Sequence, residues 1–158
     1  MKLRNMLAAT LLAAWATASV GSPLPYDEAA DAKADIRHAL SEAKADHRKV
    51  LVIFGANWCE DCRALDKAFK TGPNAELMSR QFDVVKIDVG RFNRNLDVDS
   101  VYGNAIKKGI PAAVVLSADN QVLYSTKAGE LSNARRMSET GVYEFFDNVV
   151  HTVSPQQQ

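Results

Sequence analysis

The order of hydrophobic and polar residues along the chain predicts alternating helices and strands. Apolar residues between Asp27 and about Arg48 recur at helical spacing among charged ones, which is typical of an amphipathic helix. Residues 50–54 form a continuous apolar, largely β-branched run, as in a strand buried on both faces. The same patterns predict further helices at about 59–70, 75–80, 98–108 and 142–150, and strands at 83–89, 112–116 and 121–126.

This order of elements predicts an α/β protein. Strands separated by helices favour parallel pairing, whereas the last two strands are close enough in sequence to form a hairpin around residues 117–120. We therefore expect a central mixed sheet with helices on both faces. The chain contains no internal repeat.

The first eighteen residues carry a different pattern. Lys2 and Arg4 precede an apolar run from Met6 to Ala16, and the run ends in small residues up to Ala18. This is typical of a secretory signal peptide cleaved after Ala18, because the run is shorter than the roughly 20 residues that span a bilayer. A retained membrane anchor is the alternative. We expect an exported protein, periplasmic or, in a cell with a single membrane, secreted, with no stable membrane insertion after cleavage.

Composition and charge limit the remaining possibilities. The 158 residues are 47% hydrophobic and 24% charged, with 19 Lys and Arg against 19 Asp and Glu, so the chain resembles an ordinary globular domain and has no basic field for nucleic acid. We expect a monomer with no nucleic-acid partner. After the signal peptide at 1–18, we expect a linker at 19–26, a domain at 27–153 and a disordered tail at 154–158.

The two cysteines, Cys59 and Cys62, are the candidate catalytic residues. They stand where the buried strand leads into a helix, and three-residue spacing on a helical turn places both side chains on one face, within disulfide distance. Unpaired N–H groups of the first turn favour a Cys59 thiolate, while Cys62 lies one turn deeper. Cys59 would attack a partner's disulfide, and Cys62 would then resolve the mixed disulfide. A disulfide that closes so small a loop adds little stability, so a purely structural role is a poor explanation.

Metal binding is the main alternative chemistry for this pair. A structural zinc site needs four ligands, and His38, His47 and His151 show no clustered spacing with the cysteines. We therefore predict no metal site, although a copper(I) carrier that uses the two thiolates remains an alternative. A binding module with a vestigial cysteine pair is a third possibility.

These motifs together resemble the thioredoxin superfamily, in particular exported thioredoxin-like proteins with a WCxxC active site. The resemblance covers about residues 45–152 and rests on the buried strand at 50–54, Trp58–Arg63, Val84–Asp88, Gly109–Pro111 and Gly129. It implies a thioredoxin fold with an extra N-terminal helix. It also implies protein thiol or disulfide substrates, a thiol redox partner and no organic cofactor.

The resemblance also implies how a substrate is held. The Ile110–Pro111 peptide bond would be cis and lie against the cysteines, so that the backbone of Ile110 pairs with an extended substrate segment. A trans proline that begins a strand is the alternative. Trp58 would form a partly exposed wall of the docking groove, although an aromatic residue before a helix can also belong to the core.

One departure from the family concerns the proton acceptor for Cys62. Cytosolic thioredoxins carry a buried aspartate at the position of Ile53, and Lys86 matches the lysine that accompanies it. Without that aspartate, we expect Lys86 to extend across the sheet and reach water. Glu60, Asp61 or water would then have to accept the proton of Cys62.

A second departure is the acidic pair Glu60 and Asp61, which replaces the Gly-Pro of thioredoxin between the cysteines. These acids suit the positive end of a helix on structural grounds alone. They also oppose a negative charge on Cys59 and should raise its pKa, which favours a reductase over a strong oxidant. A disulfide oxidase or isomerase is the alternative within this class.

The loop at 90–95 is longer than its thioredoxin counterpart and follows a strand at the edge where parallel sheets place their sites. Arg91, Phe92 and Arg94 are therefore candidates for selecting a partner. A solvated insertion is the alternative, because loops vary in length without functional consequence.

Overall fold

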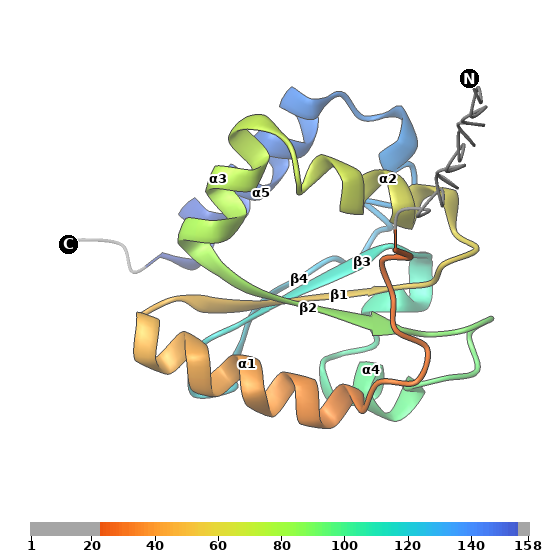
Figure 1. Cartoon of the computed structure of the whole chain (residues 1–158), viewed down its shortest axis with the longest axis horizontal. Coiled ribbons are helices and arrows are strands. Elements are labelled where there is room, and N and C mark those ends of the chain that lie inside the picture. Colours follow the sequence, from red (N-terminus) through yellow and green to blue (C-terminus); the bar gives the residue numbers. More distant parts are fainter. Residues whose placement is uncertain (1–22, 155–158) are drawn as a thin grey trace, which may run out of the picture.

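The protein, described here by a computed structural model over residues 23–154, is a four-stranded sheet between two layers of helices (Figure 1). Its elements are α1 (Ala32–Asp46), β1 (Lys49–Gly55), α2 (Glu60–Ala68), α3 (Gly72–Gln81), β2 (Phe82–Asp88), α4 (Leu96–Val101), a 3-10 helix η1 (Ala105–Lys108), β3 (Ala112–Leu116), β4 (Val122–Ser125), a 3-10 helix η2 (Ala134–Arg136) and α5 (Glu139–Val153). The predicted α/β architecture with a mixed sheet is confirmed.

The sheet is built around β1, in the order β2-β1-β3-β4. β1 pairs parallel with β2 and antiparallel with β3, and β3 continues antiparallel into β4. α2, α3 and α5 cover one face, while α1 and α4 cover the other (Figure 1). Because both faces are covered, residues 50–55 of β1 are all buried, which explains the continuous apolar run in the sequence.

Helix ends are set by capping residues. Asp31 accepts hydrogen bonds from the backbone N–H groups of Lys33 and Ala34, so α1 begins at Ala32 rather than at Asp27. The helix predicted over 98–108 is instead split into α4 and η1, because Gly103 and Asn104 between them adopt positive φ angles of 94° and 59°. This short break turns the chain toward β3.

The predicted terminal segments fall largely outside residues 23–154. The proposed signal peptide at 1–18, the first half of the proposed linker (19–22) and residues 155–158 of the proposed tail lie outside the described residues. Tyr26, which we expected at the end of that linker, is 3% exposed and belongs to the hydrophobic core. No helix within residues 23–154 is both long enough and apolar enough to cross a membrane.

Candidate active site

Cys59 and Cys62 form a disulfide at the start of α2, directly after β1 and its turn. Cys59 caps the helix rather than occupying its first turn, and the backbone N–H of Cys62 donates to the Cys59 sulfur over 3.1 Å. Cys59 is 6% exposed and Cys62 is fully buried. In the reduced protein a Cys59 thiolate would therefore sit at the positive end of α2, with Cys62 shielded beneath it.

Cys59 opens into a groove of about 460 Å³. The carbonyl oxygen of Ile110 lies 3.7 Å from the Cys59 sulfur, and the Ile110–Pro111 peptide bond is cis. Other residues that line this groove are Trp58, Glu60, Asp61, Phe92, Gly109, Ser132 and Arg135. The structure thus brings the cysteines together with Trp58 and Ile110, as the resemblance implied.

Trp58 is fixed by the loop that follows β2. Its indole N–H donates to the Gly90 carbonyl over 2.8 Å, its ring meets the edge of Phe92 with centroids 6.3 Å apart, and the Arg91 guanidinium lies 5.6 Å above it. Trp58 and Phe92 remain 45% and 44% exposed, respectively. The loop therefore adds an exposed aromatic surface beside Cys59 instead of projecting freely into solvent.

Arg94, the third candidate in that loop, points elsewhere. Its guanidinium donates to the Glu28 carbonyl oxygen over 2.9 Å and contacts the Asp88 carboxylate at 3.3 Å. Arg94 thereby ties the segment before α1 to the end of β2, and it is not among the residues that line the groove.

The acidic pair between the cysteines has a partner that the sequence analysis missed. Asp61 is buried and accepts hydrogen bonds from both the backbone N–H, at 2.9 Å, and the guanidinium of Arg135 on η2. Glu60 is exposed and its carboxylate lies 3.9 Å from the Arg135 side chain. Arg135 therefore offsets part of the negative charge beside Cys59 that favours a reductase over a strong oxidant.

Lys86 also has a partner, contrary to expectation. Its ammonium group binds the carboxylate of Asp66, which lies on α2 one turn after Cys62 and also accepts from Lys70 over 2.7 Å. Burial opposes the ionisation of Asp66, but the hydrogen bonds from Lys70 and Lys86 outweigh it and hold the pKa of Asp66 below its usual value. The helix thus carries a buried acid four residues after Cys62, whereas the strand position of the family's aspartate holds Ile53.

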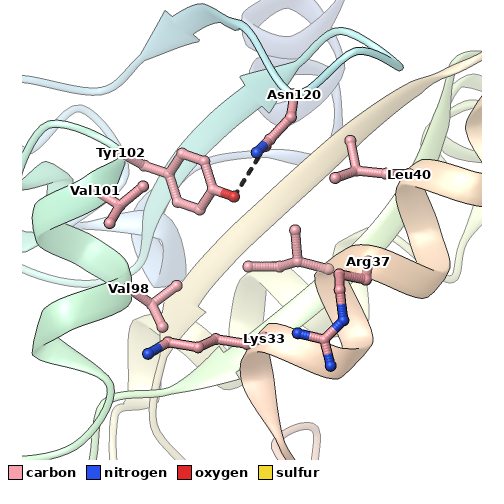
Figure 2. Close-up of a pocket in the computed structure, with 8 residues that line it drawn as sticks. Lys33, Arg37, Leu40, Val98, Val101, Tyr102 and Asn120 are labelled. Atoms are coloured by element: carbon pink, nitrogen blue, oxygen red, sulfur yellow. Dashed lines mark hydrogen bonds between the residues drawn. The ribbon is translucent and has the colours of Figure 1, made fainter.

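A second cavity, of about 240 Å³, lies between α1 and α4, where Tyr102 donates to Asn120 over 2.9 Å (Figure 2). Its walls are largely apolar, with Lys33 and Arg37 at its edge. It contains none of the predicted site residues. Within residues 23–154, no group of three or more His, Cys, Asp and Glu side chains is placed to hold a metal ion.

Comparisons with known proteins agree with this geometry. The family model described as thioredoxin-like matches residues 31–118. A solved structure titled disulphide isomerase from Xylella fastidiosa Temecula1 is 51% identical to this chain, with a TM-score of 0.79 over 82% of this chain and 98% of that one. No curated protein matches.

A more distant structure shares the fold alone. The protein titled DsbH oxidoreductase is 16% identical, with a TM-score of 0.53 over 75% of this chain and 81% of that one. The family match and the 51% identical structure are enough to assign the family. This chain belongs to the thioredoxin-like family of thiol–disulfide oxidoreductases, and its CxxC motif holds the Cys59–Cys62 disulfide.

Proposed function

We propose that this protein is an exported enzyme that reduces disulfides in partner polypeptides through Cys59 and Cys62. The observation that carries the proposal is the unequal placement of the two sulfurs: Cys59 lines an open groove at the positive end of α2, whereas Cys62 is buried beneath it. One sulfur can meet a substrate and the other cannot.

The proposed cycle has two exchange steps. The Cys59 thiolate attacks one sulfur of the partner's disulfide, forming a mixed disulfide and expelling the other partner sulfur as a thiolate, which takes up a proton. Cys62 then loses its proton and attacks Cys59, so the Cys59–Cys62 bond forms and the second partner sulfur leaves. The partner gains two electrons and the enzyme becomes the disulfide seen here. A separate thiol protein would reduce it again.

The groove suits an extended polypeptide with apolar side chains. Trp58 and Phe92 offer exposed aromatic surface on one side of Cys59, and the Ile110 backbone lies close to the sulfur on another. Backbone pairing with Ile110 would align the partner's disulfide with Cys59, and the aromatic pair would contribute apolar contact. Arg91 would add a positive charge beside this surface.

Reduction remains the favoured direction, although the excess negative charge beside Cys59 is smaller than the sequence suggests. Glu60 and Asp61 carry two negative charges and Arg135 offsets one of them, so one excess negative charge still opposes the Cys59 thiolate. Isomerisation is the second candidate, because the 51% identical structure is titled a disulphide isomerase. Both activities begin with the same attack by Cys59 and differ in which thiol resolves the mixed disulfide.

Export is proposed on the N-terminal pattern of Lys2, Arg4 and the apolar run after them. An oxidising compartment would also supply both disulfide-bearing partners and a role for a reductase. Removal of residues 1–18 from the protein recovered outside the cytoplasm, seen as a mature N-terminus by mass spectrometry, tests this part.

Trapping of partners tests the reaction itself. With Cys62→Ser the mixed disulfide cannot be resolved, so we expect polypeptides to accumulate on Cys59 and to be released by dithiothreitol. The double variant Cys59→Ser/Cys62→Ser is the control and should capture none. Failure of Cys62→Ser to form any mixed disulfide, with wild-type protein unable to cleave a protein disulfide, would overturn the proposal.

A further inference from the structure

The buried sulfur of Cys62 lies near the phenol of Tyr26, a core residue from the segment before α1. A β-carbon on Gly55 would overlap the hydroxyl of Tyr26 and would lie 3.0 Å from the Cys62 sulfur. The hydroxyl and the sulfur therefore face the same small space above Gly55. Gly55 is not at a positive φ angle, so glycine is needed here for room and not for backbone conformation.

Tyr26 is held in this place by the loop that carries the redox pair. The side-chain amide of Asn57 accepts from the Tyr26 N–H over 3.0 Å and donates to the Tyr26 carbonyl over 2.8 Å. Asn57 is two residues before Cys59, so this double hydrogen bond couples the segment before α1 to the active-site turn. The Tyr26 ring is 3% exposed, which leaves it little freedom to move away.

The hydroxyl can act as a donor throughout the neutral pH range. Burial, together with the nearby carboxylates of Asp66 and Asp88, raises the pKa of Tyr26 above its usual value. Both carboxylates are themselves paired, Asp66 with Lys70 and Lys86, and Asp88 with Arg94. Tyr26 thus stays protonated, while the nearby acids have their own cations.

We propose that, in the reduced protein, the Tyr26 hydroxyl donates a hydrogen bond to the Cys62 thiolate and stabilises it for attack on Cys59. This inference rests on the proposed dithiol exchange and assigns to Tyr26 the positioning of the resolving sulfur. A fully buried thiolate has no water to stabilise it, so a nearby hydroxyl offers the stabilisation that solvent gives an exposed one. No electrons pass through Tyr26: the Cys59–Cys62 bond forms as the bond from Cys59 to the partner sulfur breaks.

A small aromatic disulfide separates this step from the first attack. Reduced protein mixed with 5,5′-dithiobis(2-nitrobenzoate) releases one coloured thionitrobenzoate anion when Cys59 attacks and a second when Cys62 displaces the aryl thiolate from Cys59. For Tyr26→Phe we expect the rate of the first phase to stay within twofold of wild type and the rate of the second phase to fall about tenfold at pH 7. The reason is that a hydrogen bond to a charged group shifts the pKa of that group by about one unit or more. The midpoint of the second phase's pH profile should rise accordingly.

Two further variants keep this test decisive. Tyr102→Phe removes a hydroxyl that bonds to Asn120 in the other cavity and should leave both phases unchanged (Figure 2). Asn57→Ala keeps the Tyr26 hydroxyl but removes the two hydrogen bonds that hold the Tyr26 backbone, so it should also slow the second phase, by less than Tyr26→Phe. It remains informative if Tyr26→Phe does not fold.

The assignment to Tyr26 is overturned if the second phase of Tyr26→Phe keeps the rate and the pH midpoint of wild type. If Tyr26→Phe does not fold, the same result for Asn57→Ala overturns it. The measurement follows an intramolecular step with a small reagent. It therefore gives its answer whether or not Cys62→Ser captures polypeptides, and failure of the proposed function is distinguishable from failure of this inference.

Discussion

Arg135 donates two hydrogen bonds to the Asp61 carboxylate, one from its backbone N–H and one from its guanidinium, although the two residues are 74 positions apart in the sequence. The contact joins η2 to the dipeptide between the two cysteines. It places a positive charge next to the acids that would otherwise oppose a Cys59 thiolate. A residue outside the WCxxC motif thus contributes to the charge around the redox pair.

Replacement of Arg135 by alanine should make the redox pair more reducing. Loss of the guanidinium leaves both acids unopposed, which destabilises the Cys59 thiolate and shifts the reduction potential by roughly 10 to 30 mV to more negative values. Equilibration with glutathione or dithiothreitol measures this potential. Arg136→Ala, an exposed neighbour with the same charge, is the control. An equal shift in both variants would point to overall charge and not to the Asp61 contact.

The contact between Arg135 and Asp61 could not be predicted from the sequence. Cys59, Cys62, Trp58 and the Ile110–Pro111 pair are recognisable because short motifs carry them. Arg135 comes from a loop with no motif, so its meeting with Asp61 depends on tertiary packing alone. Asp66 is predictable from the sequence, because a residue four positions after Cys62 shares its helix face, although our candidate proton acceptors were Glu60, Asp61 and water.

Truncation of Phe92 should weaken the binding of polypeptide substrates and leave the reaction with small disulfides nearly unchanged. Phe92→Ala removes part of the exposed aromatic surface beside Cys59, so we expect KM for a protein disulfide to rise about three- to tenfold, a loss of about 1 kcal/mol. Reaction with a small disulfide should stay within twofold, because the cysteines are untouched. Val101→Ala, which trims an exposed apolar side chain on α4, is the control. Equal KM values for Phe92→Ala and wild type would contradict a docking role.

Asp66 should make the free energy of unfolding depend on pH in the acidic range. The pKa of Asp66 is lowered in the folded protein, so its contribution is present above the ordinary aspartate value of 3.8 and is lost as the pH falls through the lower folded value. Urea unfolding should show Asp66→Asn less stable than wild type by about 1–2 kcal/mol at pH 7, with a smaller difference at pH 3. Asp119→Asn, at an exposed pair with Lys44, should change little at either pH. A pH-independent difference for Asp66→Asn would contradict this ionic role.

A methyl group at Gly55 should be costly. Gly55→Ala would force its β-carbon into the Tyr26 ring and against the Cys62 sulfur, so we expect a loss of about 2–3 kcal/mol in the free energy of unfolding. Tyr26→Ala makes room for that methyl group. The double variant should therefore lose less stability than the sum of the two single variants, and strict additivity would show that the two positions do not compete for the same space.

The fold was more predictable than the site. Both ends of every predicted strand lie within one residue of the ends of an observed strand. The prediction works because the apolar runs of β1 and β3 directly reflect burial on both faces. The least accurate ends belong to α1 and the α4–η1 region, where the capping side chain of Asp31 and the positive φ angles at Gly103 and Asn104 decide the outcome. Such local features override hydrophobic periodicity.

The antiparallel pairing of β1 and β3 has a practical consequence. β1 ends at the redox pair, so β3 begins beside it and runs away, and the β3–β4 turn at 117–121 lies at the opposite end of the sheet (Figure 1). A biotin or a surface linker attached at Asp119, whose side chain is exposed, would immobilise the enzyme with its groove facing solution. Captured clients could then be recovered from whole extracts without the support obstructing their approach.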